Sequence, residues 1–256
     1  MTKLVPGTGG RNIALTLAYD GTAYAGWQRQ PDRPSVQGEL ERALKKICNQ
    51  SIQVIGASRT DAGAHALAQV VNFHVVSTIP LEGLYRALNS CLPEDIAVTA
   101  VQEAPKKFHA RFSAASRTYA YQIFNQSGRD PFLRTRVYHV PQVLKLGAMR
   151  KAAKVFVGEH DFSSLCTERS KISHAVRHVK RLRLTKSGPM MTLEVTANGF
   201  VRGMIRTMVQ ALVEVGLGRQ TAASLKRFMA ARDRQRAPRA APAHGLYLVK
   251  VSYRGI

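Results

Sequence analysis

Apolar and polar positions alternate with two different periods along the chain, and the changes of period predict the order of its elements. Every second residue from 13 to 19 is apolar or aromatic, which is the pattern of a strand with one buried face. From 36 to 47 the apolar residues recur at helical spacing, after the helix-start signal of Pro34 and Ser35. The same criteria predict strands over 52–55, 69–75 and 96–103 and a helix over 81–88. The expected order is strand, helix, strand, strand, helix, strand.

The later part of the chain repeats this order, which indicates an internal duplication. The repeat consists of strands over 117–125, 176–185, 190–197 and 246–253 and helices over 144–157 and 201–215, with an additional helix over 222–230. The duplication predicts an α+β fold of two ferredoxin-like split β-α-β units, one in residues 1–108 and one in residues 109–256. With their sheets joined edge to edge, a central cleft would lie between the halves.

The composition is that of a globular chain without a membrane segment. Of the 256 residues, 45% are hydrophobic, which is enough for a substantial core. No stretch approaches the roughly 20 apolar residues that cross a bilayer, and residues 1–11 lack the apolar centre of a signal peptide. Cys48, Cys91 and Cys166 lack CxxC spacing and are expected to be buried thiols. These features predict a cytoplasmic protein.

Charge is distributed unevenly along the chain. The net charge is +22; residues 1–108 carry 11 basic and 9 acidic side chains, whereas residues 109–256 carry 27 and 7. Such an excess attracts phosphate backbones and, by the same field, anionic membranes. Because no basic amphipathic anchor helix is evident, the charge favours nucleic acid and makes the cleft the expected binding site.

A polar, turn-forming segment over 57–65 separates two β-branched runs and contains the candidate reagent, Asp61. Gly63 can adopt the positive φ that such turns often need, so the two flanking strands can hold the carboxylate rigidly. Arg59 lies two residues earlier, where it can pair with Asp61 or reach a substrate. On local sequence alone, Asp61 is equally consistent with a turn cap, and His65 is more consistent with support of the turn than with proton transfer.

Five sequence blocks resemble, in order, those of the tRNA pseudouridine synthase A family. They are Tyr19-Asp20-Gly21 with Gly26-Trp27-Gln28-Arg29-Gln30, then Arg59-Thr60-Asp61-Ala62-Gly63-Ala64-His65, Phe108-His109-Ala110-Arg111-Phe112-Ser113-Ala114, Phe200-Val201-Arg202-Gly203-Met204-Ile205-Arg206, and Gly245-Leu246-Tyr247-Leu248. Two departures are Ser58, where many members carry Gly, and Thr207-Met208-Val209-Gln210, where Asn-Ile-Val-Gly is common.

The resemblance implies isomerisation of uridine to pseudouridine at positions 38, 39 and 40 of the tRNA anticodon stem-loop, by a homodimer that needs no cofactor. Asp61 would be the essential carboxylate; attack at the sugar C1′, attack at uracil C6 and removal of the C2′ proton all remain open. Tyr119 would stack on the flipped uracil and is a candidate base for the C5 proton, while Arg206 would partner Asp61. The absence of a phosphate-binding Gly loop, a dinucleotide motif and a metal-ligand cluster in the sequence agrees with this chemistry.

Basic side chains are the candidates for holding the RNA. Arg59 is suited to fill the space that an extruded uridine leaves, and Tyr119 would contact the base itself. Backbone contacts are expected from Lys106, Lys107, Arg111, Arg117 and Arg202. From pattern alone, an ordinary core or sheet-surface aromatic of an alternating strand is the favoured reading of Tyr119. The corresponding reading of Arg206 is a solvated helix face that it shares with Arg202.

Two other functional classes remain open from the sequence. A non-catalytic RNA-binding or RNA-remodelling protein would carry the same charge and the same paired units. A base-excising glycosylase would use a similar carboxylate but would release free uracil.

Overall fold

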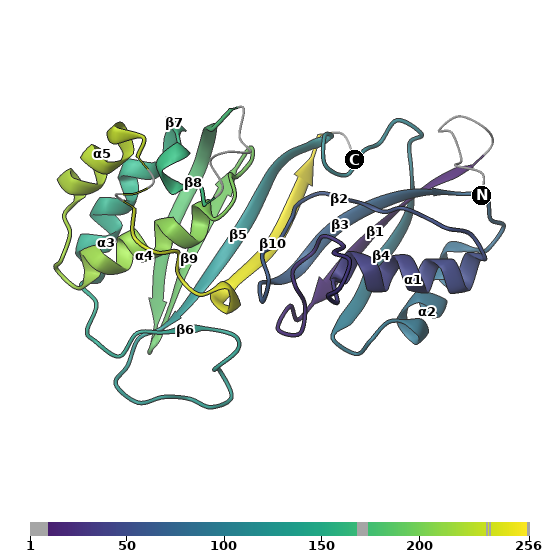
Figure 1. Ribbon diagram of the computed structural model, residues 1–256, viewed down its shortest axis with the longest axis horizontal. Helices are drawn as coiled ribbons and strands as arrows, with labels where there is room; N and C mark the ends of the chain where they lie inside the picture. The colour runs from purple at the N-terminus through teal and green to yellow at the C-terminus, as the bar shows by residue number, and fades with distance from the viewer. Residues whose placement is uncertain (1–9, 168–173, 234, 236, 255–256) are drawn as a thin grey trace. The chain divides into compact units, whose positions relative to one another are not determined.

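The computed structural model of the chain describes residues 10–167, 174–233, 235 and 237–254 (Figure 1). The described residues form a mixed α/β fold with five α-helices. They divide into two compact units: unit 1 has the residues up to 115 and from 248 onward, and unit 2 has residues 116–247. The predicted halves, 1–108 and 109–256, follow the sequence repeat rather than contacts, and that division stays a prediction.

Unit 1 contains β-strands and two helices. Its strands are β1 (Arg11–Tyr19), β2 (Ile55–Gly56), β3 (His65–Val75), β4 (Ile96–Ala104) and most of β10 (Leu246–Tyr253), and its helices are α1 (Val36–Cys48) and α2 (Leu81–Cys91). The strand order is β4-β1-β3-β10, with β2 paired to β3. At the centre, Leu15 of β1 lies opposite Val71 of β3 and Val101 of β4.

Alternation along β1 builds the core of unit 1. Ile13, Leu15 and Leu17 are at most 1% exposed, and burial of such side chains stabilises by about 1.5–3 kcal/mol each. Helix α1 supplies Leu40 and Leu44, which are also fully buried. The periodicity that predicts these two elements therefore identifies the residues that pack between them.

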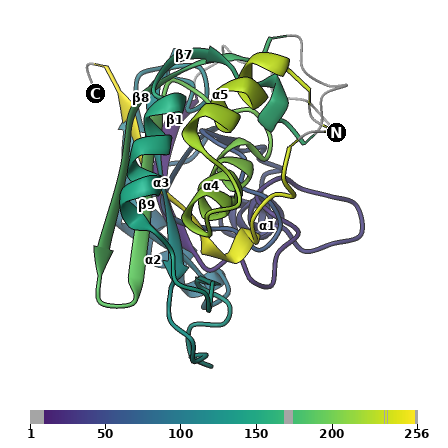
Figure 2. The same ribbon diagram turned by 90° about the vertical axis from the view of Figure 1, so that its left-hand side faces the viewer.

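Unit 2 contains further β-strands and three helices. Its elements are β5 (Ala114–Phe124), β6 (Tyr138–His139), α3 (Leu146–Ala153), β7 (Gly158–Asp161), β8 (Val176–Ser187), β9 (Met190–Ala197), α4 (Met204–Gly216) and α5 (Ala222–Ala231), with short 3-10 helices at Lys154–Phe156, Ser163–Leu165 and Ala243–Gly245. The strand order is β5-β9-β8-β7, and β6 runs parallel beside β5. Helix α3 contacts α4, α5 and β8, so the helices of unit 2 gather together (Figure 2).

The predicted strand over 52–55 is mostly wrong, because β2 begins only at Ile55. Ile52 and Val54 are buried, as a strand residue would be, but side chains of α1 replace the neighbouring strand. Glu41 accepts a hydrogen bond from Val54 N at 3.1 Å, and Gln37 donates one to Val54 O at 3.3 Å. The backbone is thus satisfied without a strand partner.

Two predicted helices have different bounds in the structure. The helix expected over 144–157 is confined to Leu146–Ala153, followed by a 3-10 turn. The helix expected from 201 begins at Met204, after Gly203 with a φ of +74°. Because a left-handed residue cannot lie inside an α-helix, Arg202 is outside α4, and the expected helix face shared by Arg202 and Arg206 is wrong.

Candidate active site

Asp61 lies in a tight turn of unit 1 between β2 and β3. Ala64 N donates to Asp61 O at 3.1 Å, and Gly63 has a φ of +79°. A positive φ at this third position is what a type II turn requires, so the predicted use of Gly63 is confirmed. Thr60 is buried, Asp61 is half-buried and Arg59 is exposed. The turn therefore leaves Asp61 partly accessible, next to the buried Thr60.

The loop over 21–30 cradles the Asp61 turn through backbone hydrogen bonds. Trp27 N donates to Thr60 O at 3.1 Å, and Gly63 N donates to Tyr24 O at 3.3 Å. The Tyr19 hydroxyl and Thr60 Oγ1 are 2.8 Å apart in a buried hydrogen bond. The turn is consequently bonded both before and after Asp61.

Two glycines allow this close approach. A Cβ on Gly21 would lie 1.9 Å from Ala64 O, and a Cβ on Gly26, whose φ is +101°, would lie 2.6 Å from Thr60 O. Both obstacles are backbone atoms, which cannot move aside as a side chain can. Glycine is thus required where the loop meets the turn.

His65 is 3% exposed and supports the same junction. Its Nδ1 lies 3.0 Å from Gly21 N and 3.1 Å from Asp20 Oδ1. A neutral Nδ1 accepts from Gly21 N, whereas a protonated Nδ1 donates to Asp20. Both contacts join the end of β1 to the start of β3, which fits the supporting role expected for this histidine.

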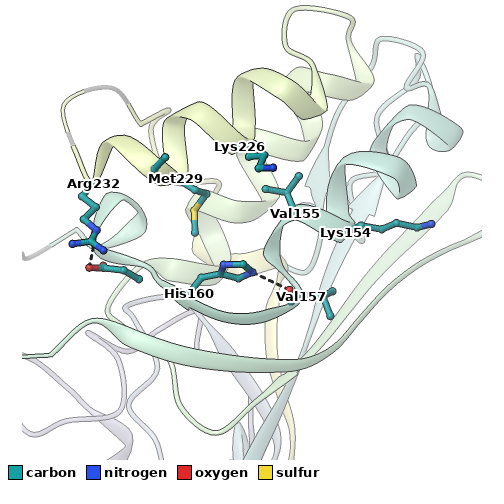
Figure 3. Close-up of a pocket in the computed structure, with 9 residues that line it drawn as sticks. Lys154, Val155, Val157, His160, Lys226, Met229 and Arg232 are labelled. Atoms are coloured by element: carbon teal, nitrogen blue, oxygen red, sulfur yellow. Dashed lines mark hydrogen bonds and ion pairs between the residues drawn. The ribbon is translucent and has the colours of Figure 1, made fainter.

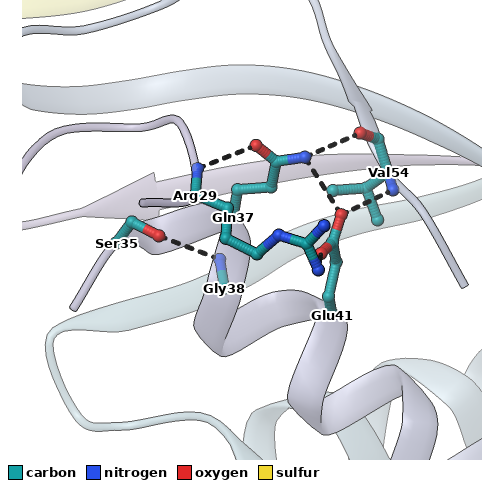
Figure 4. A network of polar contacts seen from close by, with 6 residues as sticks. All are labelled: Arg29, Ser35, Gln37, Gly38, Glu41 and Val54. Carbon is teal, nitrogen blue, oxygen red and sulfur yellow. Dashed lines mark hydrogen bonds and ion pairs between the residues drawn. The ribbon is translucent and has the colours of Figure 1, made fainter. Parts of the chain in front are cut away.

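A polar network on α1 holds the far end of the cradling loop (Figure 4). Gln37 Oε1 accepts from Arg29 N at 3.0 Å, and Gln37 Nε2 donates to Glu41 Oε1 at 3.0 Å. Glu41 is 9% exposed and pairs with the Arg29 guanidinium at 3.3 Å. At the helix start, Ser35 Oγ accepts from Gly38 N at 3.3 Å. This network was not predicted from the sequence. The signal that could have indicated it is Glu41, an acidic residue beside the apolar positions of α1.

Tyr24 ties the loop to the segment before β4. Its hydroxyl donates to Asp95 Oδ1. Burial, together with the hydrogen bond and the negative charge of Asp95, raises the pKa of the Tyr24 phenol. The phenol is therefore a stable donor at neutral pH.

In unit 2, Tyr119 and Arg117 lie on β5 and are largely buried. Tyr119 is 4% exposed, and its ring packs edge-on against Phe200 at 5.2 Å. Arg117 is 9% exposed and donates from Nη1 to Asn198 O at 3.1 Å. A phosphate contact by Arg117 stays a prediction. The guanidinium would have to make that contact while it donates to Asn198 O, or give up this hydrogen bond.

Arg206 lies in the first turn of α4 and is tied to a loop far away in sequence. Its Nε donates to Ala241 O at 2.6 Å, and its own carbonyl accepts from Ala241 N at 3.0 Å. The guanidinium charge also lowers the pKa of Tyr121, whose burial raises it more strongly. Arg202 is exposed, and its carbonyl accepts from Thr167 N at 2.9 Å.

The remaining basic candidates, Lys106, Lys107 and Arg111, belong to unit 1 and are all exposed, on two successive turns. The structure thus places Asp61, Arg59 and these three cations in unit 1. Tyr119, Arg117, Arg202 and Arg206 are in unit 2.

A pocket in unit 2 does not involve any predicted site residue (Figure 3). It has a volume of about 810 Å³ and lies beside α5 and β7, where Arg232 pairs with Asp161 at 3.3 Å. Lys154, Lys226 and Met229 also line it. The pocket combines cations with apolar surface but lacks the candidate carboxylate.

The described residues include neither a cluster of metal-ligating side chains nor a membrane-spanning helix. Within them, no group of three or more His, Cys, Asp or Glu side chains could hold a metal ion. In the same part of the chain, no helix has the length and apolar character needed to span a bilayer. The burial expected for the cysteines is confirmed for Cys166 and is wrong for Cys48 and Cys91, which are half-buried, and none of the three is in a disulfide.

Comparisons with known proteins agree with one another. The family model described as tRNA pseudouridine synthase matches residues 16–113 and 152–254. A protein of Caldicellulosiruptor bescii named tRNA pseudouridine synthase A is 41% identical over 243 residues, covering 95% of this chain and 100% of its own. Proteins of the same name from Acetivibrio thermocellus and Brevibacillus brevis are 42% and 41% identical, with the same coverage.

Proposed function

Because the chain belongs to the tRNA pseudouridine synthase family, we propose that it isomerises uridine to pseudouridine at positions 38, 39 and 40 of the tRNA anticodon stem-loop. In this reaction the N1–C1′ glycosidic bond breaks, the uracil rotates while bound, and C5 bonds to C1′. C5 loses its proton to a base and then to water, and N1 gains one. The product keeps the mass of the substrate, and no outside reagent is consumed.

The Asp61 turn is the observation that carries the proposal. A carboxylate that reacts with a nucleoside must be held in place before the substrate arrives. The hydrogen bonds from Trp27 N to Thr60 O and from Gly63 N to Tyr24 O fix the backbone on both sides of Asp61. Asp61 itself is only half-buried, so a substrate can approach it. We propose that the ionised carboxylate attacks C1′, attacks C6 or removes the C2′ proton.

Tyr119 and Arg206 are proposed to complete the chemistry. Tyr119 would stack on the extruded uracil and accept the C5 proton, and Phe200 packs edge-on against its ring. Arg206 would partner Asp61. The bond from Arg206 Nε to Ala241 O supports this role, because it sets the plane of the guanidinium. Arg59 would fill the space left by the extruded nucleotide.

We also propose that the fold is built from ferredoxin-like split units. Unit 1 supports this proposal with the element order β1-α1-β2-β3-α2-β4 and the strand order β4-β1-β3, with β2 next to β3. The edge-to-edge arrangement around an RNA-binding cleft, the homodimer and the cytoplasmic location stay predictions. Sedimentation of the purified protein would test the homodimer.

Release of tritium from tRNA labelled at uracil C5 tests the activity. We expect the wild-type protein to release label to water and Asp61→Asn to release none above background. Binding by Asp61→Asn should stay within about tenfold of wild type, because phosphate contacts dominate affinity. Asp32→Asn, the same change at an exposed position of unit 1, is the matched control and should keep full activity.

The product distinguishes the alternative functions. Pseudouridine leaves the RNA mass unchanged and gives a stable carbodiimide adduct. Free uracil with an abasic RNA would establish a glycosylase instead. Binding without any tritium release by the wild type would establish a non-catalytic RNA-binding protein, and equal release by wild type and Asp61→Asn would remove Asp61 from the mechanism.

A further inference from the structure

A turn of unit 1, residues 105–113, is anchored to the sheet by two buried asparagines; we call it the Phe112 turn. Asn12 of β1 is 1% exposed and donates to Phe108 O at 3.0 Å. Asn72 of β3 is 0% exposed, donates to Asn12 Oδ1 at 2.9 Å and accepts from Ala110 N at 2.8 Å. Buried amides with such partners hold a segment rigidly, because breaking any bond leaves a polar atom unsatisfied.

The last strand provides a second anchor, and the tip of the turn is closed on itself. The Tyr253 hydroxyl donates to Ala110 O at 2.8 Å, and the Tyr253 ring packs edge-on against Phe108 at 5.0 Å. At the tip, Ser113 N donates to His109 O at 2.9 Å, and His109 N donates to Ser113 Oγ at 3.1 Å. The backbone at the tip is therefore fixed without help from the Phe112 side chain.

The Phe112 side chain is held out in solvent on this fixed backbone. It is 75% exposed, and its ring lies 4.4 Å from the His109 ring with a tilt of 32°. His109 Nδ1 accepts from both Arg111 N and Phe112 N at 3.2 Å, which fixes the histidine beneath the ring. The Arg111 guanidinium carbon lies 5.3 Å from the centre of the Phe112 ring, within cation–π range.

Basic side chains accompany the exposed ring on this segment. Arg111 lies against the ring, and Lys106 and Lys107 are exposed a few residues earlier, in a chain whose net charge is +22. Proteins that bind single-stranded nucleic acid combine these two elements: cations follow the phosphates, and aromatic rings stack on the bases.

We propose that Phe112 is a stacking platform for an unpaired base of the RNA substrate, with the adjacent phosphates held by Arg111, Lys106 and Lys107. This inference rests on the proposed function, which supplies the RNA substrate. It adds a contact to a base, whereas the cations by themselves recognise only the charge and shape of the RNA. The stacked base is a neighbour of the reacting uridine rather than the reacting uridine, for which Tyr119 is proposed.

A nucleobase fits this surface better than a protein partner does. Stable protein interfaces bury roughly 800 Å² on each side, and their centres are depleted in charge. The Phe112 turn offers one exposed ring with the Arg111 guanidinium beside it, and an unpaired nucleotide matches this pair with one aromatic face and one negative charge.

The test compares two RNAs bound by variants of Phe112 in an Asp61→Asn protein, which prevents turnover. One RNA is an anticodon-arm stem-loop, and the other is a blunt duplex of the same length without unpaired bases. We expect Phe112→Leu, which keeps apolar volume but removes the ring, to weaken binding of the stem-loop about 5- to 100-fold. Duplex binding should change less than twofold, and Phe112→Trp should keep stem-loop binding. Because the ring is neutral, the salt dependence of binding should not change.

Phe132→Leu is the matched control, since Phe132 is 87% exposed in unit 2 and makes none of the contacts described for Phe112. Unchanged stem-loop binding by Phe112→Leu, or an equal loss for both RNAs, would overturn the proposal. A change in sedimentation of the protein without RNA would also overturn it, by showing that the ring is a contact between copies. The tritium assay separates these failures from failure of the proposed function, because wild-type turnover is measured independently of Phe112.

Discussion

The Asp61 turn of unit 1 and the Arg206 turn of unit 2 are fixed by different means. The Asp61 turn is bonded to its cradle mainly through backbone atoms, and Gly21 and Gly26 leave no room for a Cβ. The Arg206 turn is joined to residue 241 by a side-chain bond from Nε in addition to a backbone bond. Backbone contacts make a position tolerant of most side-chain changes and intolerant of added bulk at the glycines. A side-chain bond makes it depend on one residue type.

The largest effect is expected from Gly21→Ala. The new Cβ would lie 1.9 Å from Ala64 O, so the cradle and the turn must separate. We expect the free energy of unfolding to fall by about 3 kcal/mol, with loss of tritium release. Gly147→Ala is the control: a Cβ there meets nothing within 4 Å, and Ala favours a helix over Gly, so chemical denaturation should show a gain of up to about 1 kcal/mol. Equal stability of the two variants would refute the close approach.

Arg206→Lys should reduce turnover with little effect on stability. Lysine keeps the charge but lacks the Nε donor that binds Ala241 O at 2.6 Å, so its ammonium group is no longer oriented. We expect kcat for pseudouridine formation to fall about 10- to 100-fold, because a misplaced catalytic group costs this much. Arg227→Lys on α5, at an exposed position, is the matched control. If Arg206→Lys had full kcat, the oriented guanidinium would have no role in the reaction.

Tyr24→Phe should cost about 1 kcal/mol at neutral pH, the typical value of one hydrogen bond, here to Asp95. The substitution should also change how the free energy of unfolding falls at alkaline pH. The folded protein raises the Tyr24 pKa above its unfolded value near 10, so this stability is fully present below pH 10 and is lost as the pH rises further. Urea denaturation at pH 8 and pH 10.5 should show a smaller alkaline loss for the variant. An identical loss in both proteins would contradict the raised pKa.

The smallest effect is expected from Thr207→Val in α4. Thr207 is 0% exposed, and its hydroxyl has no hydrogen-bond partner among the described residues. Valine has the same shape without the polar atom, so thermal unfolding should show a change between zero and a gain of about 1 kcal/mol. A clear loss of stability would reveal a partner for this hydroxyl.

Elements whose signal is local were predictable from the sequence. The strand expected over 246–253 coincides with β10, and the helix expected over 222–230 differs from α5 by one residue. The periodicity of these segments is fixed by their own side chains. The short β2 was not predictable, because the groups that satisfy Val54 come from α1, 13 and 17 residues away.

The features of the candidate site also differ in whether their sequence signal is local. The positive φ of Gly63 follows from its turn and was predicted, whereas the close approach of Gly21 to Ala64 depends on how β1 ends and β3 begins. Arg202 was misplaced on α4 because helical periodicity continues through Gly203 in sequence but not in backbone conformation. Contacts between distant segments carry no periodic signal, so a single sequence does not disclose them.

Because of the two buried asparagines, the Phe112 turn can form only after β1 and β3 have paired in the correct register. Asn12 and Asn72 point to the same side of the sheet only in the observed pairing, in which Ala14 lies opposite Asn72. A slip of one residue between β1 and β3 would turn one amide to the other side and leave the turn without its anchor. Amide hydrogens of the turn should therefore gain protection from exchange only after those of β1 and β3, so that the turn reports whether the two strands have found their alignment.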